Sequence, residues 1–111
     1  MCGFCAFYDK TKISNKKKII KDMADRIKHR GPDSDGYYVD ENIAMGFRRL
    51  SIIDLKGGNQ PLYNENKNIV VMFNGEIYNF MELRGELEKL NHIFTTNSDT
   101  EVIVHGYEEY G

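Results

Sequence analysis

The spacing of apolar residues changes several times along this chain, and each change predicts a new element of secondary structure. Short aromatic and β-branched runs at residues 4–8 and 69–73 are typical of buried strands. The second run is the clearer strand, because it is uncharged and bounded by turn residues. Two more runs, 37–39 and 43–47, flank the polar residues 40–42 and predict a β-hairpin.

Three other stretches have the helical spacing of apolar positions. The first begins after Ser14 and Asn15, either of which can cap a helix, and continues to about His29. Asn79 can cap a second helix, whose leucines follow a heptad-like spacing. Residues 98–101 form an S-x-x-E capping box before a third helix.

The resulting order is strand, helix, several strands, helix, short strand and helix, which is the α+β pattern. Residues 29–36 and most of 54–68 are rich in glycine, proline and asparagine, so they predict turns and loops. Three helices need more apolar sheet surface than these strands supply. We therefore expect residues 1–111 to be one part of a larger domain.

Composition narrows the class of protein without defining a function. With 111 residues, 41% apolar and 29% charged, the chain is at most one ordinary globular domain. A net charge of -2 argues against nucleic acid or an anionic membrane as a partner, and the basic run at 16–18 is typical of a solvated helix face. No apolar stretch approaches the ~20 residues of a membrane span, and the first residues lack a signal-peptide layout. We therefore expect a cytoplasmic protein.

Two cysteines near the N-terminus, Cys2 and Cys5, allow four interpretations. A redox C-x-x-C pair lies at the start of a helix, whereas these cysteines fall in or beside a predicted strand. A zinc half-site would need a second such pair, and the histidines are scattered singly. Both cysteines can also be buried apolar side chains. The fourth interpretation depends on position, because removal of Met1 would leave Cys2 as the first residue.

An N-terminal Cys2 would carry a thiol and a free α-amine on one residue. That amine has an ordinary pKa of about 7.7–8.0, so it can act as a general base near neutral pH. Hydrolases with this arrangement also need an oxyanion hole and a substrate clamp. The remainder of the sequence can be searched for both.

Six motifs follow one another along the chain: MCGF at the start, HRGPDSDG at 29–36, RRLSIIDL at 48–55, NQPL at 59–62, FNGEIYN at 73–79 and SDTEV at 98–102. Together they closely resemble the glutamine-hydrolysing domain of class II amidotransferases, and specifically the glutamine-dependent asparagine synthetases. The resemblance covers the whole chain. It implies the αββα sandwich of N-terminal-nucleophile hydrolases, with only the first half of that sandwich present here.

The resemblance implies catalytic roles for Cys2, Asn74 and Gly75. Cys2 would attack the side-chain amide of glutamine, and its α-amine would handle the protons through a water. The Asn74 side chain and the backbone N–H of Gly75 would stabilise the oxyanion. Taken alone, Asn-Gly is also the strongest short signal for a type I′ hairpin turn, and the two interpretations are compatible.

The resemblance also implies a glutamine-binding site. Arg49 would hold the substrate α-carboxylate, a task suited to a forked guanidinium, and a surface ion pair with Asp54 is the alternative. Asp99, helped by Glu76, would receive the α-ammonium, although a carboxylate in the first turn of a helix is favoured without substrate too. The residues implied in glutamine binding are Arg49, Leu50, Ser51, Ile52, Ile53, Asn74, Gly75, Glu76 and Asp99.

Three positions depart from the family pattern or have no role in it. Ala6 stands where glycine is usual, and its methyl group could crowd the strand. Phe47 stands where histidine is common, which removes any hydrogen bond from that side chain. Cys5 has no implied role and is most simply a buried apolar side chain.

The family's glutaminase domain is longer than this chain and is normally followed by an ATP-using synthetase domain that activates aspartate and receives ammonia. We therefore expect no cofactor or metal in this chain, and ATP and magnesium in the missing domain. The expected partners are L-glutamine, that synthetase domain and a second copy covering the open sheet face. The alternatives are a non-catalytic fragment or interaction module, and a related amidotransferase with another acceptor.

Overall fold

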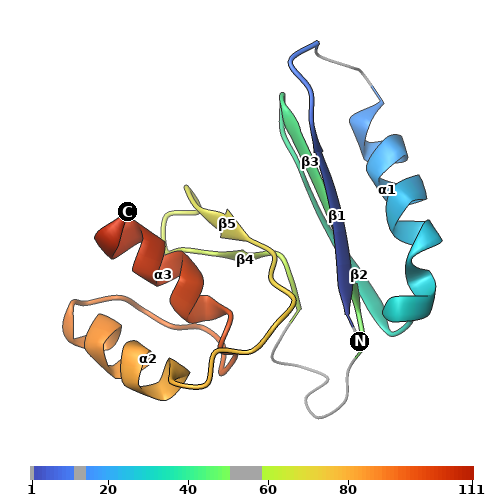
Figure 1. Cartoon of the computed structure of the whole chain (residues 1–111). Helices are drawn as coiled ribbons and strands as arrows, with labels where there is room; N and C mark the ends of the chain where they lie inside the picture. The colour runs from blue at the N-terminus through green and yellow to red at the C-terminus, as the bar shows by residue number, and fades with distance from the viewer. Residues whose placement is uncertain (1, 12–14, 51–58) are drawn as a thin grey trace.

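The computed structural model describes residues 2–11, 15–50 and 59–111, which form two lobes (Figure 1). The first lobe contains β1 (Gly3–Tyr8), α1 (Lys16–Arg26), a 3-10 turn (Lys28–Arg30), β2 (Ser34–Val39) and β3 (Ile43–Arg49). The second lobe contains β4 (Leu62–Tyr63), β5 (Val70–Val71), α2 (Phe80–Lys89) and α3 (Glu101–Tyr110). Both sheets are antiparallel, so the mixed α+β class expected from the sequence is confirmed. No helix among the described residues is long and apolar enough to cross a membrane.

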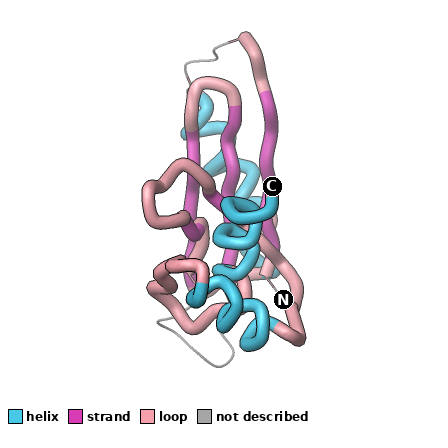
Figure 2. The backbone as a smooth tube through the Cα atoms, turned by 90° about the vertical axis from the view of Figure 1, so that its left-hand side faces the viewer, coloured by secondary structure: helices cyan, strands magenta, loops and turns pink. Residues whose placement is uncertain are grey.

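The sheet of the first lobe has the strand order β1-β3-β2. The predicted hairpin is present as β2 and β3, and β1 pairs with the other edge of β3. Seen from the second lobe, the three strands lie side by side with α1 behind them (Figure 2). Because side chains alternate along a strand, Cys5 and Gly46 face α1, whereas Phe4 and Phe47 face the opposite side.

The contact between α1 and the sheet depends on small residues. Ile20 and Ala24 are 1% and 0% exposed, and a Cβ atom at Gly46 would lie 3.3 Å from side-chain atoms of both. Glycine at this point therefore allows the helix to approach β3 closely. The helix ends at Arg26 rather than near His29, because the chain tightens into a 3-10 turn directly afterwards.

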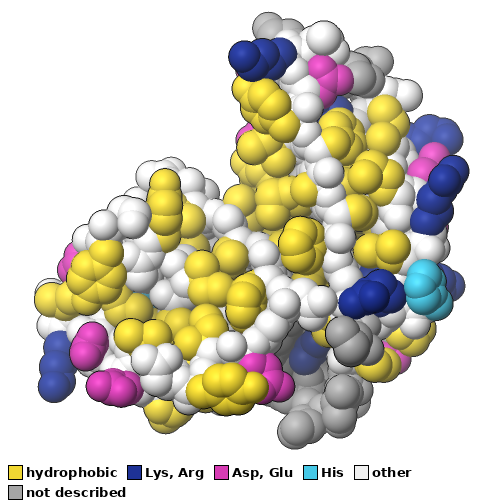
Figure 3. Space-filling model, in the orientation of Figure 1, with side chains coloured by type: hydrophobic (Ala, Val, Ile, Leu, Met, Phe, Trp, Pro, Cys, Tyr) yellow, Lys and Arg dark blue, Asp and Glu magenta, His cyan; other side chains and the backbone are white. Residues whose placement is uncertain are grey.

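The sheet face away from α1 remains partly uncovered. Phe4 and Tyr8 on this face are 53% and 61% exposed, and Figure 3 shows hydrophobic side chains gathered over this part of the first lobe. An αββα sandwich would bury such a face under a second sheet. The described residues show one helix layer on one sheet here, so the sandwich itself stays a prediction.

The second sheet is shorter than the sequence indicates. The run at 69–73 pairs only through Val70 and Val71, and its partner β4 lies in a stretch predicted as loop. The reason is a side chain: Gln60 donates to the carbonyl oxygen of Phe73 at 2.9 Å and accepts from its N–H. An amide side chain thus takes the place of a neighbouring strand.

The two helices of the second lobe begin close to the predicted positions, but their capping differs. The Asn79 side chain makes no capping hydrogen bond to α2. The prediction of a reciprocal capping box before α3 is wrong. The Glu101 carboxylate accepts hydrogen bonds instead from the backbone N–H groups of Thr95 and Thr96, both at 2.8 Å. Ser98 Oγ accepts instead from the N–H of Thr100 at 3.1 Å.

We expect Gly36→Ala to destabilise the protein by about 1–3 kcal/mol, the usual cost of overpacking. A Cβ atom at Gly36 would lie 1.7 Å from the backbone oxygen of Gln60, so the segment that supports Phe73 would have to move. Gly85→Ala is the matched control, since Gly85 lies in α2 with nothing within 4 Å of its Cβ position, and helix propensity predicts about 1 kcal/mol of stabilisation. Urea unfolding measures both, and equal stability of the two variants would contradict the close approach at Gly36.

Candidate active site

A cavity of about 670 Å³ lies where the two lobes meet. Its wall is formed by the first residues of the chain, the end of β3, the segment between β5 and α2, and the segment before α3. Seven candidate residues line it: Cys2, Arg49, Leu50, Asn74, Gly75, Glu76 and Asp99. The other three, Ser51, Ile52 and Ile53, lie outside the described residues.

Cys2 lies directly before β1 and lines the cavity with a half-buried side chain. Its Sγ atom accepts a hydrogen bond from the backbone N–H of Leu50 at 3.4 Å. Its carbonyl oxygen accepts from Asn74 Nδ2 at 3.1 Å and from Arg30 Nε at 3.3 Å. Three distant segments of the chain therefore hold this residue in position.

Asn74 and Gly75 follow β5 and reach across from the second lobe to the first. Asn74 uses one N–H of its amide nitrogen on Cys2, and the same nitrogen carries a second N–H. Gly75 lacks the positive φ that a type I′ turn requires, and β5 pairs with the preceding strand β4, so the hairpin interpretation is wrong. A Cβ atom at Gly75 would lie 2.7 Å from the ring of Phe73, so any larger residue would displace that ring.

Two further residues position these groups and were not singled out from the sequence. Arg30 holds the carbonyl of Cys2, and Gln60 holds the backbone of Phe73, directly before Asn74. Both lie in motifs that the resemblance depends on, HRGPDSDG and NQPL, which is the signal that could have identified them.

Arg49 ends β3 and lines the cavity, and its Nη1 donates to Asn59 Oδ1 at 3.0 Å. Its neighbour Arg48 alternates to the α1 side of the sheet, where it is buried and donates to the Gly31 carbonyl at 2.9 Å. Alternation therefore assigns the two adjacent arginines to different faces. The alternative partner of Arg49, Asp54, lies outside the described residues.

Asp99 and Glu76 bring carboxylates to the same cavity. Asp99 Oδ2 accepts from the backbone N–H of Ile77 at 2.8 Å, which ties the segment after Gly75 to the start of α3. Asp99 lies two residues before α3 rather than within its first turn. The cavity thus presents one guanidinium and two carboxylates, which complement the carboxylate and ammonium groups of an α-amino acid.

Cys5 is separate from this site. Cys2 lines the cavity just before β1, whereas Cys5 lies within β1 and faces α1, and both are free thiols. Cys5 is half-buried toward α1, with Sγ 3.8 Å from the Gly46 carbonyl oxygen. Burial raises the pKa of the Cys5 thiol, and the backbone hydrogen bond at Gly46 offsets only part of that rise.

We therefore expect a thiol alkylating reagent at mildly alkaline pH to modify Cys2 before Cys5. Cys2 faces the cavity, whereas the raised pKa of Cys5 lowers its thiolate fraction at any given pH, and the thiolate is the reactive form. Peptide mass spectrometry after brief treatment measures the two rates. Denaturation should make the two rates similar, and faster modification of Cys5 in the folded protein would contradict the geometry.

The two departures from the family pattern have different outcomes. Ala6 is exposed on the face of β1 away from α1, so the expectation that its methyl group crowds the strand is wrong. Phe47 is 2% exposed and lines the cavity, where its ring provides an apolar wall and no hydrogen bond.

The cavity combines a cysteine with an amide donor, an arginine and carboxylates. These are the groups that an amide-hydrolysing site can use. A family model described as "Glutamine amidotransferase domain" matches residues 1–111, and the chain belongs to this family.

Its relatives point to one branch of that family. Asparagine synthetase [glutamine-hydrolyzing] 1 of Bacillus subtilis is 50% identical over 99% of this chain, and asparagine synthetase [glutamine-hydrolyzing] 2 of the same organism is 57% identical over 84%. Asparagine synthetase [glutamine-hydrolyzing] of Zea mays is 47% identical over 100% of the chain. The matched regions are 18%, 12% and 19% of those proteins, so this chain spans less than a fifth of the relatives it matches.

Proposed function

We propose that this chain is the glutaminase part of a glutamine-hydrolysing asparagine synthetase, and that it hydrolyses L-glutamine to glutamate and ammonia. The observation that carries the proposal is the hydrogen bond from Asn74 to Cys2, which joins the two lobes at the cavity lined by Arg49 and Asp99. The identity to named glutamine-hydrolysing enzymes agrees with this chemistry.

In this proposal the cavity binds glutamine by both ends of its amino-acid group. Arg49 pairs with the α-carboxylate through two parallel N–H donors. Asp99 and Glu76 receive the α-ammonium, and the hydrogen bond from Ile77 fixes the Asp99 carboxylate. Leu50 lines the same cavity. The side-chain amide of the substrate then extends toward Cys2.

The first chemical step forms a thioester. With Met1 removed, the α-amine of Cys2 accepts the thiol proton through a water, and Sγ attacks the amide carbon. Asn74 and the Gly75 N–H donate to the oxygen as it becomes an oxyanion, a contribution of about 3 kcal/mol for each donor. The carbon–nitrogen bond then breaks, and the departing nitrogen takes the proton and leaves as ammonia.

The second step releases glutamate. A water donates a proton to the α-amine and attacks the thioester carbon, and the same two donors stabilise the second oxyanion. The carbon–sulfur bond then breaks and glutamate is released, and the protonated α-amine returns its proton to the sulfur, which restores Cys2.

We propose that the ammonia is used for amidation of aspartate by the synthetase part of a longer cytoplasmic enzyme. ATP and magnesium would bind in that part, and neither enters the glutaminase step.

The partly uncovered sheet face around Phe4 and Tyr8 is then the surface for the second half of the sandwich or for a second copy of the chain.

Glutamate release from L-glutamine tests this function directly. The protein, with removal of Met1 verified by intact mass, should hydrolyse L-glutamine and leave untouched an analogue that lacks the α-carboxylate, because the proposed contact of that carboxylate with Arg49 is then lost. An absence of glutamate release from correctly processed protein would overturn the proposal.

A further inference from the structure

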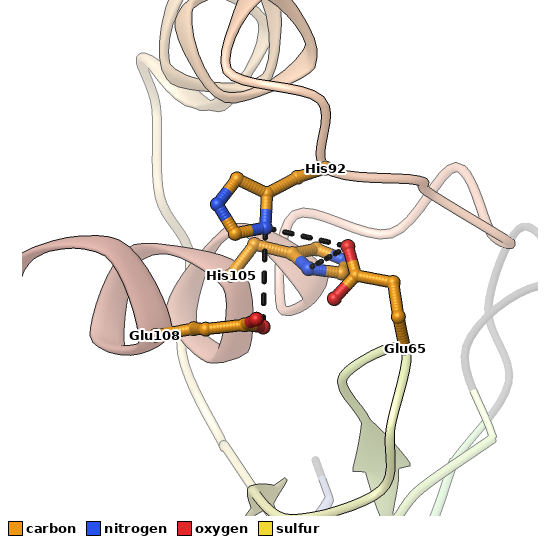
Figure 4. Close-up of side chains that lie close together, drawn as sticks. All are labelled: Glu65, His92, His105 and Glu108. Atoms are coloured by element: carbon orange, nitrogen blue, oxygen red, sulfur yellow. Dashed lines mark hydrogen bonds and ion pairs between the residues drawn. The ribbon is translucent and has the colours of Figure 1, made fainter.

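Four side chains of types that can bind a metal ion meet in the second lobe, outside the cavity that Cys2 lines. Glu65 comes from the turn between β4 and β5, His92 from the loop after α2, and His105 and Glu108 from α3 (Figure 4). One nitrogen or oxygen atom of each lies within 4.8 Å of the other three. Segments far apart in the sequence therefore direct two imidazoles and two carboxylates to one point.

The two ring nitrogens of the buried His105 have different surroundings. The side chain is 1% exposed, and its Nε2 lies 3.0 Å from Glu101 Oε2. The Glu101 carboxylate already accepts hydrogen bonds from Thr95 and Thr96, so it acts as an acceptor and assigns the proton to Nε2. The other ring nitrogen, Nδ1, then carries a lone pair.

That lone pair lacks a donor among the described residues. Nδ1 of His105 is buried and makes no hydrogen bond, although it lies 3.2 Å from Glu65 Oε1. The buried nitrogen thus faces a carboxylate oxygen without a hydrogen bond, which costs free energy unless a proton or a metal cation lies between the two atoms. Phe94 packs its ring 4.4 Å from the His105 ring and restricts rotation away from this arrangement.

Two of the separations in this cluster match those around a small tetrahedral ion, and a third is longer. Zinc bonded at about 2.0–2.1 Å to four ligands separates neighbouring ligand atoms by about 3.3–3.4 Å. Glu65 Oε1 lies 3.3 Å from His92 Nδ1 and 3.2 Å from His105 Nδ1, and Glu108 Oε2 lies 3.9 Å from His92 Nδ1. Glu108 Oε2 also accepts a hydrogen bond from Asn64 Nδ2 at 2.8 Å, so its side chain would have to turn toward the ion to close the remaining distance.

We propose that Glu65, His92, His105 and Glu108 form a zinc site. Two imidazoles and two carboxylates suit zinc, whereas magnesium and calcium prefer oxygen ligands alone. Glu101 pairs with Nε2 of His105, the ring nitrogen that would not bind the zinc. Zinc-bound histidines commonly donate their other ring N–H to a carboxylate in this way. Four protein ligands leave no open position, so the site is structural.

A zinc ion at this site would cross-link the second lobe. It would join the β4–β5 turn, the loop after α2 and α3, three segments that share only a small core. Asp99 lies two residues before α3, so fixing α3 also fixes one wall of the candidate active site. The zinc site and the glutaminase are separate proposals, because neither uses a residue of the other.

Zinc binding by the chelator-treated protein tests the proposal. After equilibration with Zn(II) and removal of free metal, elemental analysis should find one zinc per chain. Co(II) in its place should give the intense visible absorption of a tetrahedral site without thiolate charge transfer. A different stoichiometry, an octahedral cobalt spectrum or a thiolate signature would each overturn the assignment.

Paired variants separate these ligands from other acidic residues. Glu65→Gln with Glu108→Gln keeps the size and one acceptor oxygen of each side chain but removes both charges, and it should weaken zinc affinity by at least about 10-fold. The matched control is Glu86→Gln with Glu109→Gln, which removes the same charge from exposed positions of α2 and α3 and should bind zinc as before. Circular dichroism verifies that both variants are folded. Equal zinc affinity of the two double variants would show that the metal binds elsewhere, and the cluster would then be a hydrogen-bonded network only.

Discussion

Replacing Cys2 by alanine should abolish glutamate release from L-glutamine, and replacing it by serine should lower kcat by roughly 10⁴-fold or more. The reason is that a thioester cannot form without the sulfur, and a hydroxyl is far less acidic than a thiol, so the α-amine removes its proton much less readily. Glutamate measured by a coupled assay gives both rates. Substrate binding should persist in both variants, since Arg49 and Asp99 are unchanged.

The control for this prediction is Cys5→Ala. Cys5 faces α1 rather than the cavity, so its loss should leave kcat and KM within about twofold of the original protein, in the range of ordinary small packing changes. Equal glutamate release from Cys2→Ala and the original protein would remove Cys2 from the mechanism.

Replacing Asn74 by alanine should lower kcat by about 10²–10³-fold with a much smaller change in KM, the usual result of removing one oxyanion donor. The effect falls on kcat because the charge on the substrate oxygen develops only in the transition state. Steady-state kinetics with L-glutamine measures the two constants separately.

Asn74 also holds the carbonyl of Cys2, so a purely positional role must be distinguished from an oxyanion role. Arg30→Ala provides the comparison, because it removes the other donor to the same carbonyl and is not proposed to contact the substrate. We expect Arg30→Ala to cost far less in kcat than Asn74→Ala. Equal losses would mean that Asn74 acts only by positioning Cys2.

The first lobe was predictable because its signals are local. The strands at 4–8 and 43–47 and the hairpin around 40–42 appear where alternation and turn residues placed them. The helix between the strand at 4–8 and the hairpin is also present, although it ends at Arg26, where a 3-10 turn follows.

The second lobe was less predictable because side chains distant in sequence replace regular backbone pairing. Gln60 takes the place of a strand beside Phe73, and it does so across 13 residues of chain. Glu101 fits a capping-box pattern by spacing, yet burial against Thr95 and Thr96 turns its carboxylate toward a different segment. The spacing of residues does not show which of several possible hydrogen-bond partners a side chain takes.

The candidate site likewise contains some residues that the sequence predicts and others that it does not. Cys2, Arg49 and Asn74 could be chosen from motifs, and the structure brings their side chains to one cavity. The positioning roles of Arg30 and Gln60 could not be chosen, because each depends on a contact with a backbone group far away along the chain. The catalytic roles themselves stay predictions until they are measured.

The most direct test of the central claim is to trap the acyl-enzyme. Protein lacking Met1 is mixed with L-glutamine, quenched in acid within the first turnovers and digested for peptide mass spectrometry. The account predicts a glutamyl adduct on the peptide that contains Cys2, absent from Cys2→Ala and lost on treatment with hydroxylamine, which cleaves thioesters. Glutamate release with no adduct on Cys2, or an adduct on Cys5 instead, would contradict it.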